Sequence, residues 1–222
     1  MLKILFFCVA ILMPQSIQAF AGSPVHVVDG DTLDVGGIRY RLHGIDAPEA
    51  AQVCAGRDGG SWKCGQDSIR VMEELTGGKS VECDDRGHDA YGRTIAVCTA
   101  AGVEINALMI EQGMAWAFRK YSQDYVKAED AARRRGVGIW QAPTETAWDF
   151  RAHKWKSSLS AAPDRACPIK GNINRKHERI YHVPWSKDYG KTRIDVAKGE
   201  RWFCTEEEAI AAGWRAPLWG HE

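Results

Sequence analysis

Two short acidic segments carry the side chains best suited to chemistry. The first is Asp29-Gly30-Asp31-Thr32, and the second is Asp46-Ala47-Pro48-Glu49. Hard cations such as Ca²⁺ take oxygen ligands, and a site forms where carboxylates from different segments converge. Asp31 and Asp46 are therefore the candidate metal carboxylates. Glu49 follows Asp46 across a proline, where its carboxylate could take a proton from water as a general base.

Two arginines add the groups that a phosphate ester would need. Arg41 lies on the segment that leads into Asp46, and Arg93 follows the turn Tyr91-Gly92. Guanidinium groups donate paired hydrogen bonds to phosphate and stay charged, so they stabilise negative charge in a phosphoryl transition state. Each feature alone also has a plainer interpretation, because Asp-Gly and Asp-x-Pro are common in turns. An isolated strand arginine is most often a surface ion-pair partner.

Short β-rich runs surround these residues. Strands are expected at 25–28, 32–35, 38–45, 79–83 and 94–98, and helices at 64–76, 103–112 and from Ser122, as a capping residue, to Gly136. This order predicts an α+β fold that is mainly β barrel. We expect an OB-fold, a small twisted five-stranded barrel with about three helices packed around it.

The chain length of 222 residues accommodates one ordinary domain and a smaller second unit. We predict an OB-fold domain over residues 22–142 and a small C-terminal module over residues 164–222. Residues 143–163 form a helical connector and linker, rich in tryptophan and basic residues. The formal net charge is zero, with 29 basic and 29 acidic side chains. A polyanion would therefore have to be bound by a local arginine cluster and not by a uniformly basic face.

Residues 1–21 have the layout of a secretory signal peptide. A lysine precedes the apolar run 4–13, and small residues follow, with cleavage after Ala19 or Ala21 fitting equally well. The apolar run is too short to span a bilayer. We therefore expect a periplasmic or secreted monomer without stable membrane insertion after cleavage.

Six cysteines remain beyond this segment. An even number in an oxidising compartment predicts disulfides. Their order along the chain suggests the pairs Cys54–Cys64, Cys83–Cys98 and Cys167–Cys204. A zinc site formed by Cys167 and Cys204 with the nearby His177 and His182 is the alternative in the C-terminal module.

The order of several motifs resembles one nuclease family. The motifs are Val28-Asp29-Gly30-Asp31-Thr32, Arg41-Leu42-His43-Gly44-Ile45-Asp46-Ala47-Pro48-Glu49, Asp89-Ala90-Tyr91-Gly92-Arg93, Gly113-Met114-Ala115-Trp116-Ala117 and Gly136-Val137-Gly138-Ile139-Trp140. Together they resemble the thermonuclease, or staphylococcal-nuclease-like, family from about Val25 to Trp140.

The resemblance implies an OB-fold endonuclease that hydrolyses DNA and RNA with Ca²⁺, leaving 3′-phosphate ends. Asp31, Asp46 and the main-chain carbonyl of Ala47 would bind the metal, and Glu49 would activate water. Arg41 and Arg93 would contact the phosphate. Tyr91 and Tyr121 are candidate substrate-binding residues, while Trp116 and Phe118 could form a base-stacking platform or belong to the core. The alternative function is a catalytically silent OB-type domain of the cell envelope that binds nucleic acid or protein.

Overall fold

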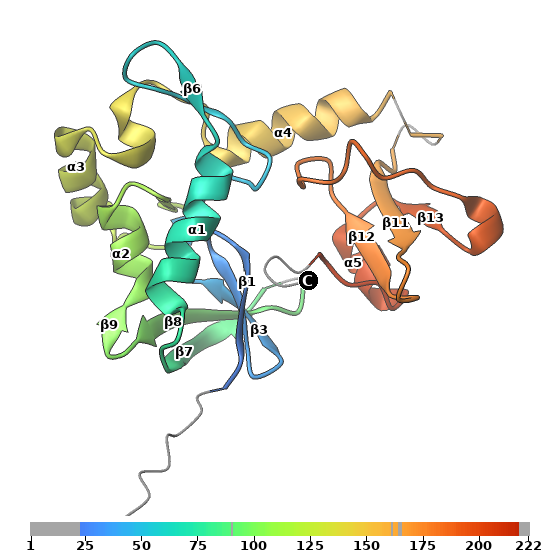
Figure 1. Cartoon of the computed structure of the whole chain (residues 1–222), viewed down its shortest axis with the longest axis horizontal. Coiled ribbons are helices and arrows are strands. Elements are labelled where there is room, and N and C mark those ends of the chain that lie inside the picture. Colours follow the sequence, from blue (N-terminus) through green and yellow to red (C-terminus); the bar gives the residue numbers. More distant parts are fainter. Residues whose placement is uncertain (1–22, 90, 161, 164–165, 218–222) are drawn as a thin grey trace, which may run out of the picture.

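The computed structural model describes residues 23–89, 91–160, 162–163 and 166–217. The predicted signal peptide, residues 1–21, lies outside the described residues. Figure 1 shows two units joined by a long helix: a larger one built on the first β-sheet and a smaller one that carries the C-terminal strands. None of the described helices is long and apolar enough to cross a membrane.

The main sheet begins with hairpins whose turns can be recognised in the sequence. The strands β1 (Val25–Asp29), β2 (Thr32–Val35) and β3 (Ile38–Leu42) are antiparallel neighbours. The turn between β2 and β3 consists of two glycines with φ of +59° and +86°, a backbone region that favours glycine. This turn reverses the chain and sets β3, which carries Arg41, beside the Asp31 turn.

The sheet continues from β3 into the second half of the unit. β3 is parallel to β8 (Thr94–Ala100), which pairs antiparallel with β7 (Val81–His88) and with the short β9 (Val103–Glu104). The hydrogen-bonded path runs β1-β2-β3-β8-β7, and no ladder among the described residues joins its two edge strands. The mixed sheet and its helices agree with the predicted α+β class, while closure of the barrel stays a prediction.

The predicted strand 38–45 is interrupted. Gly44 adopts φ +70°, and the following β4 (Ile45–Asp46) leaves the main sheet to pair with β10 (Trp116–Ala117). A side chain at Gly44 would also lie 2.9 Å from the ring of Tyr125. This bend turns Asp46 into the interior, where its side chain is fully buried.

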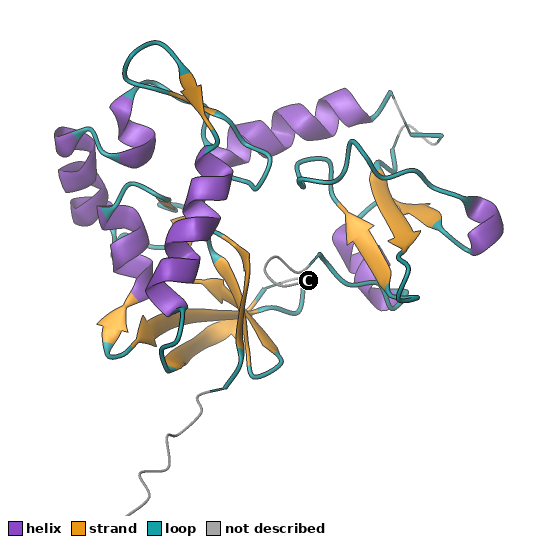
Figure 2. Ribbon diagram, in the orientation of Figure 1, coloured by secondary structure: helices purple, strands orange, loops and turns teal. Residues whose placement is uncertain are grey.

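Three helices gather on one side of the sheet (Figure 2). α1 (Cys64–Thr76) has the predicted bounds, α2 (Ile105–Glu111) begins after β9, and α3 (Val126–Arg135) precedes a short 3₁₀ turn, η1 (Gly138–Gln141). The predicted cap at Ser122 is wrong, because its hydroxyl accepts from the Asp124 amide in a turn that ends before α3 starts. The core between sheet and helices is fully buried at Leu33, Leu42, Met72, Ile105 and Met109.

The connecting helix α4 (Ala147–Ser158) begins at Thr146, whose hydroxyl accepts from the Asp149 amide as an N-cap. The C-terminal unit beyond it has a sheet in the order β12 (Arg179–His182), β11 (Ile169–Ile173) and β13 (Arg201–Phe203). A 3₁₀ turn, η2 (Val196–Lys198), and the helix α5 (Glu206–Ala211) complete this unit. Its core is centred on Ile169, Phe203 and Trp214, and Trp155 of α4 packs against it.

Three disulfides are present: Cys54–Cys64, Cys83–Cys98 and Cys167–Cys204, the pairs predicted from chain order. The first closes the loop that carries the short hairpin β5 (Cys54–Ala55) and β6 (Ser61–Trp62) onto the start of α1. The second joins directly opposed residues of β7 and β8. The third ties the start of β11 to the end of β13, so the cysteines of the C-terminal unit form a disulfide and not a zinc site.

Candidate active site

The first acidic turn is held against α1 by close packing. Gly30 sits where a Cβ atom would come within 2.0 Å of the Ser68 hydroxyl and 2.7 Å of the Ala47 methyl. Only glycine permits this approach of the β1–β2 turn to the helix. Asp31 is consequently buried, with 2% of its surface exposed, and its Oδ2 accepts a 2.8 Å hydrogen bond from the Ala47 amide. The two acidic segments of the sequence therefore touch directly.

Arg41 connects the carboxylates of these two segments. Its Nη1 donates to Oδ1 of Asp31, and its Nη2 donates to Oδ1 of Asp46 at 2.8 Å. Burial raises the pKa of Asp31, and the Arg41 guanidinium acts in the opposite direction. The neighbouring carboxylates in turn raise the pKa of Arg41 above its ordinary value despite its own burial. The arginine therefore stays charged and compensates two buried acids.

A second arginine, Arg151 of α4, enters the same cluster from outside the predicted nuclease domain. Its Nη1 and Nη2 donate to the two oxygens of Asp46 at 3.0 and 2.7 Å, and Nη1 also donates to Oε1 of Glu49 at 2.6 Å. Sequence reasoning placed Arg151 only in a basic connector helix. No local pattern links it to Asp46, which lies 105 residues earlier.

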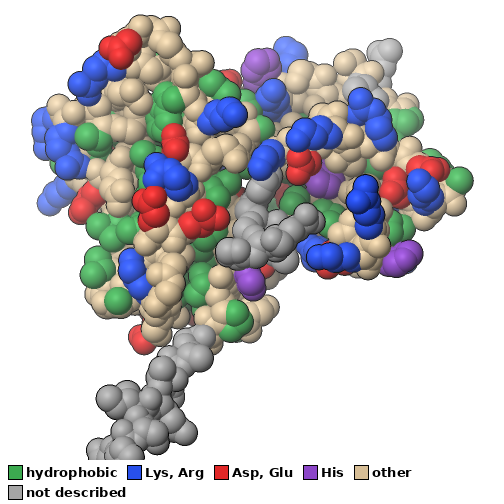
Figure 3. Space-filling model, viewed as in Figure 1, with side chains coloured by type: hydrophobic (Ala, Val, Ile, Leu, Met, Phe, Trp, Pro, Cys, Tyr) green, Lys and Arg blue, Asp and Glu red, His purple; other side chains and the backbone are tan. Residues whose placement is uncertain are grey.

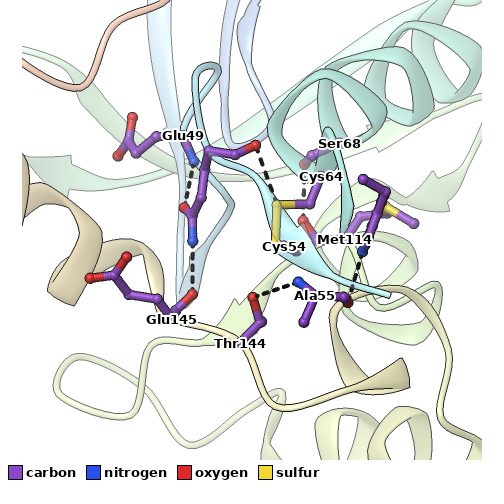
Figure 4. Close-up of a disulfide and its surroundings, with 10 residues drawn as sticks. Glu49, Cys54, Ala55, Cys64, Ser68, Met114, Thr144 and Glu145 are labelled. Atoms are coloured by element: carbon purple, nitrogen blue, oxygen red, sulfur yellow. Dashed lines mark hydrogen bonds between the residues drawn. A yellow bond between two sulfur atoms is a disulfide. The ribbon is translucent and has the colours of Figure 1, made fainter. Parts of the chain in front are cut away.

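The backbone of Glu49 is held by a hydrogen bond to Gln52 and by close packing against Gly65. The Glu49 amide donates to Oε1 of the buried Gln52 at 3.1 Å, while the Gln52 side-chain amide donates to the Glu145 carbonyl at 2.7 Å (Figure 4). Gly65 at the start of α1 allows the Glu49 carbonyl to approach, because a Cβ atom there would lie 1.8 Å from that oxygen. Gln52 thus ties the Glu49 loop to the segment that precedes α4 and its Arg151.

The Glu49 carboxyl has the electrostatics of a proton acceptor. Burial raises its pKa to about 8, and the adjacent Arg151 guanidinium opposes that rise. A carboxyl with a pKa near the working pH is suited to general base catalysis, since it combines a usable ionised fraction with strong basicity.

A cleft of about 1120 Å³ lies over this cluster, with walls from both units. The larger unit contributes Arg41, Glu49, Tyr91, Arg93 and Tyr121 to these walls. The helix α4 contributes Arg151 and Trp155, and the C-terminal unit contributes Tyr181 and Trp185. Basic side chains elsewhere are interspersed with acidic ones over both units on the face drawn in Figure 3. The arginines that line the cleft are accompanied there by acidic side chains, among them Asp29, Asp89 and Glu206.

Arg93 and Tyr91 line the cleft without joining the ion-pair cluster. Nε of Arg93 donates to Asp89 at 2.7 Å, and its guanidinium lies 5.3 Å from the centre of the Tyr91 ring. The Asp89 carboxylate also accepts from the amides of Tyr91 and Arg93, which fixes the turn. Of the aromatic candidates, Tyr121 is 65% exposed and Trp116 is part of the core.

The oxygen donors suited to a hard cation are few. Within the described part of the chain, no group of three or more His, Cys, Asp or Glu side chains gathers as a ready-made metal site. The candidate oxygen ligands in the cluster are the two buried carboxylates of Asp31 and Asp46. Ala47, which follows Asp46 in the chain, is held next to Asp31 by the hydrogen bond from its amide.

Comparison with known proteins finds a family match within the larger unit. Residues 39–142 match the family described as staphylococcal nuclease homologue, whose domain is an OB-fold. This segment contains Arg41, Asp46, Glu49 and Arg93, whereas Asp31 precedes it and Arg151 follows it.

Three relatives illustrate the similarity. Succinoglycan biosynthesis protein ExoI of Rhizobium meliloti (strain 1021) is 36% identical over 175 residues, which are 75% of this chain and 81% of that protein. The micrococcal nuclease of Shigella flexneri is 33% identical over 163 residues, 64% of this chain and 88% of that protein. An uncharacterized endonuclease of Haemophilus influenzae is 37% identical over 123 residues, 52% of this chain and 64% of that protein. The chain belongs to the staphylococcal-nuclease-like family, and its relatives support a nuclease function.

Proposed function

We propose that this protein is an exported, Ca²⁺-dependent endonuclease that hydrolyses phosphodiester bonds of DNA and RNA. The observation that carries the proposal is the joining of Asp31, Asp46, Glu49 and two arginines in one ion-pair cluster at the base of a cleft. Buried acids and arginines at a cleft are typical of a catalytic centre, because burying charge is costly without a functional return.

The chemistry of the donor set fits a hard cation. Asp31 and Asp46 supply buried anionic oxygens from two segments that touch, and carboxylate and carbonyl oxygens are the ligands that Ca²⁺ takes. Asp31, Asp46 and the Ala47 carbonyl would hold the ion. When bound, it would neutralise phosphate charge and polarise the phosphorus–oxygen bonds.

The side chains divide the hydrolysis between them. Glu49 accepts a proton from the water that attacks phosphorus, and its raised pKa makes it a stronger base than an ordinary glutamate. Arg41 and Arg93 donate to the non-bridging phosphate oxygens, where negative charge grows. The bond between phosphorus and the 5′-oxygen breaks, and this oxygen takes a proton from solvent water as it leaves. Tyr91 and Tyr121 line the same cleft and contact the nucleotide. Arg151 holds Oε1 of Glu49 and so fixes the direction of its carboxylate.

Export is proposed from two separate features. Residues 1–21 have the composition of a signal peptide, and three disulfides require an oxidising compartment to form and persist. A periplasmic or secreted location satisfies both, and we propose that the enzyme acts there as a monomer.

The test is plasmid digestion by the mature chain with Ca²⁺ and with EDTA, alongside Glu49→Gln and the exposed control Glu82→Gln. We expect Glu49→Gln to lose about a hundredfold to ten-thousandfold in rate, the usual contribution of a general base, while Glu82→Gln cleaves normally. If wild type and Glu49→Gln leave the plasmid equally intact, the chain is instead a silent OB-type binding domain. Full cleavage with Mg²⁺ alone would contradict the Ca²⁺ assignment.

A further inference from the structure

Arg151 binds the same carboxylate oxygens that the proposed function assigns to the ion. Its Nη2 donates to Oδ2 of Asp46 at 2.7 Å, and its Nη1 donates to Oδ1 of the same carboxylate at 3.0 Å. This two-pronged contact is the strong geometry of an arginine–carboxylate pair. The Asp46 side chain is fully buried, so its oxygens face the groups packed around them and not solvent.

Of the two arginines in the cluster, Arg151 is the one that can release Asp46 and leave both sides with a partner. Asp46 would keep Nη2 of Arg41 at 2.8 Å, and Arg151 would keep Oε1 of Glu49 at 2.6 Å. Arg41 is differently placed, because it also pairs with the buried Asp31. Its release would deprive two buried acids of a counter-charge at once.

Two cations cannot share the Asp46 carboxylate without strong repulsion. An ion bound to one of its oxygens would lie within a few ångströms of a guanidinium that donates to the same group, and its double charge enlarges the repulsion. Salt screens buried charges poorly. An arginine stays charged and cannot relieve the repulsion by losing a proton. Arg151 and a divalent ion must therefore bind Asp46 in competition.

The position of Arg151 is set from outside the catalytic unit. Arg151 and Trp155 are four residues apart on α4, so their side chains lie on one face of this helix. Trp155 packs against the core of the C-terminal unit, and its ring centroid lies 6.3 Å from that of Trp185. Figure 1 shows α4 running from the larger unit to the smaller one. The packing of Trp155 therefore helps to place the guanidinium one turn earlier.

We propose that Arg151 is an internal cation that competes with Ca²⁺ for Asp46, so that α4 sets the affinity of the metal site. The guanidinium leaves Asp46 when the ion binds, while its contact with Glu49 remains. Binding and displacement are two sides of one coupling, so contacts that hold Arg151 on Asp46 lower the affinity for the ion. This inference rests on the proposed Ca²⁺ site. It adds control of that site by a residue that follows the family match at 39–142.

The test measures binding of Ca²⁺ to the full mature chain by isothermal titration calorimetry, without nucleic acid. Arg151→Gln keeps a polar side chain and removes the charge. We expect it to bind Ca²⁺ about tenfold to a hundredfold more tightly than wild type, within the usual range of a coupling between two ligands. Lys154→Gln is the matched control, because it removes a charge from the next turn of α4, where the Lys154 ammonium lies over the Phe150 ring. It should bind Ca²⁺ as wild type does.

Thermal unfolding gives a second readout that a merely structural arginine would not produce. In EDTA, Arg151→Gln should melt below wild type, because the buried Asp46 and Glu49 lose a counter-charge. Added Ca²⁺ should then raise the melting temperature of the variant more than that of wild type, since an ion that binds the folded chain stabilises it in proportion to its affinity. A purely structural role would give equal Ca²⁺-induced shifts.

A free guanidinium ion tests the competition directly. Arg151→Ala removes the side chain and leaves space for such an ion beside Asp46. A low, non-denaturing concentration of guanidinium chloride should weaken Ca²⁺ binding by this variant more than NaCl of the same ionic strength. Wild type should respond equally to the two salts. An equal response of Arg151→Ala to both salts would contradict the competition.

The outcomes separate this inference from the proposed function. Equal Ca²⁺ affinities of wild type and Arg151→Gln would overturn the inference and leave the Ca²⁺-dependent nuclease standing. If wild type and every variant fail to bind Ca²⁺, the Ca²⁺ dependence itself fails and the competition fails with it. An Arg151→Gln protein that folds only in Ca²⁺ supports the competition, because the ion then replaces the missing charge. If it does not fold at all, Arg151→Lys decides: it keeps the charge without the two-pronged contact, and an affinity no higher than that of wild type would overturn the inference.

Discussion

Charged side chains are buried in both units of the protein, but they are satisfied in different ways. In the nuclease unit, Asp31 and Asp46 are bound by the guanidinium groups of Arg41 and Arg151 beside an open cleft. In the C-terminal unit, the ammonium of Lys170 donates to the backbone carbonyls of Tyr189 and Thr192 at 2.9 Å, with the Tyr189 ring 4.1 Å away.

The buried Glu200 of the C-terminal unit follows the same backbone pattern. It accepts from the amides of Ile173 and Asp195 at 2.9 and 2.8 Å. A charge bound only by backbone groups fixes the local conformation of the chain. Charges bound to one another at a cleft can be rearranged by an arriving ion or phosphate, as the proposed catalytic role requires.

Removing Arg41 should have the largest effect, because it breaks the reactive cluster at its centre. Arg41→Gln leaves the buried Asp31 and Asp46 short of one counter-charge, and we expect phosphodiesterase activity to fall about a hundredfold to a thousandfold. Plasmid digestion under single-turnover conditions measures it. Arg39→Gln, on the same strand but paired with Asp34, is the control. Equal losses for the two variants would contradict the assignment of Arg41.

Opening the disulfide of the C-terminal unit should destabilise that unit more than opening the first disulfide affects the nuclease unit. The Cys167–Cys204 loop spans 37 residues and the Cys54–Cys64 loop spans 10. Chain entropy assigns them about 4 and about 3 kcal/mol respectively. Urea unfolding of the two double serine variants measures the free energy of unfolding that each disulfide contributes. A larger decrease in this free energy for Cys54→Ser/Cys64→Ser than for Cys167→Ser/Cys204→Ser would contradict the prediction.

Neutralising Lys170 should cost stability and spare catalysis. Lys170→Met leaves two backbone carbonyls without their donor, which we expect to lower the free energy of unfolding by about 2 kcal/mol. Lys176→Met, an exposed control in the same unit, should change it by less than about 0.5 kcal/mol. Cleavage rate per folded molecule is the second readout, and a large drop for Lys170→Met would remove the distinction between the two kinds of buried charge.

The smallest effect is a pH dependence in the C-terminal unit. Burial lowers the pKa of His182; the nearby Asp188 opposes this shift and Lys170 adds to it. Among the described residues, Nδ1 of the His182 ring has no hydrogen-bond partner. The unfolded chain therefore binds the proton more readily, and stability is lost as pH falls through the ordinary histidine value of about 6.5. Urea unfolding above and below this value should show a steeper loss for wild type than for His182→Gln. Identical slopes would assign the pH dependence to other groups.

Much of the fold could be read from local signals. The turn at Asp29-Gly30, the double glycine before β3 and the apolar spacing of α1 predict elements that the structure contains. The order of the cysteines predicts the three disulfides. The break at Gly44 was missed, because the close packing of this glycine against the ring of Tyr125 depends on the tertiary structure. The late start of α3 was missed, because the Ser122 hydroxyl accepts from the Asp124 amide in a turn and does not cap the helix.

The sequence by itself determined which residue types could do chemistry: two acidic turns, a strand arginine and a turn arginine in an order that resembles a nuclease family. Only the tertiary structure decided that Arg151, more than a hundred residues after Asp46, completes the cluster. The physical reason is that α4 is placed by long-range contacts, through Gln52 at one end and Trp155 at the other. The face of α4 that contacts Asp46 and Glu49 depends on that placement, and no periodic pattern in the sequence indicates it.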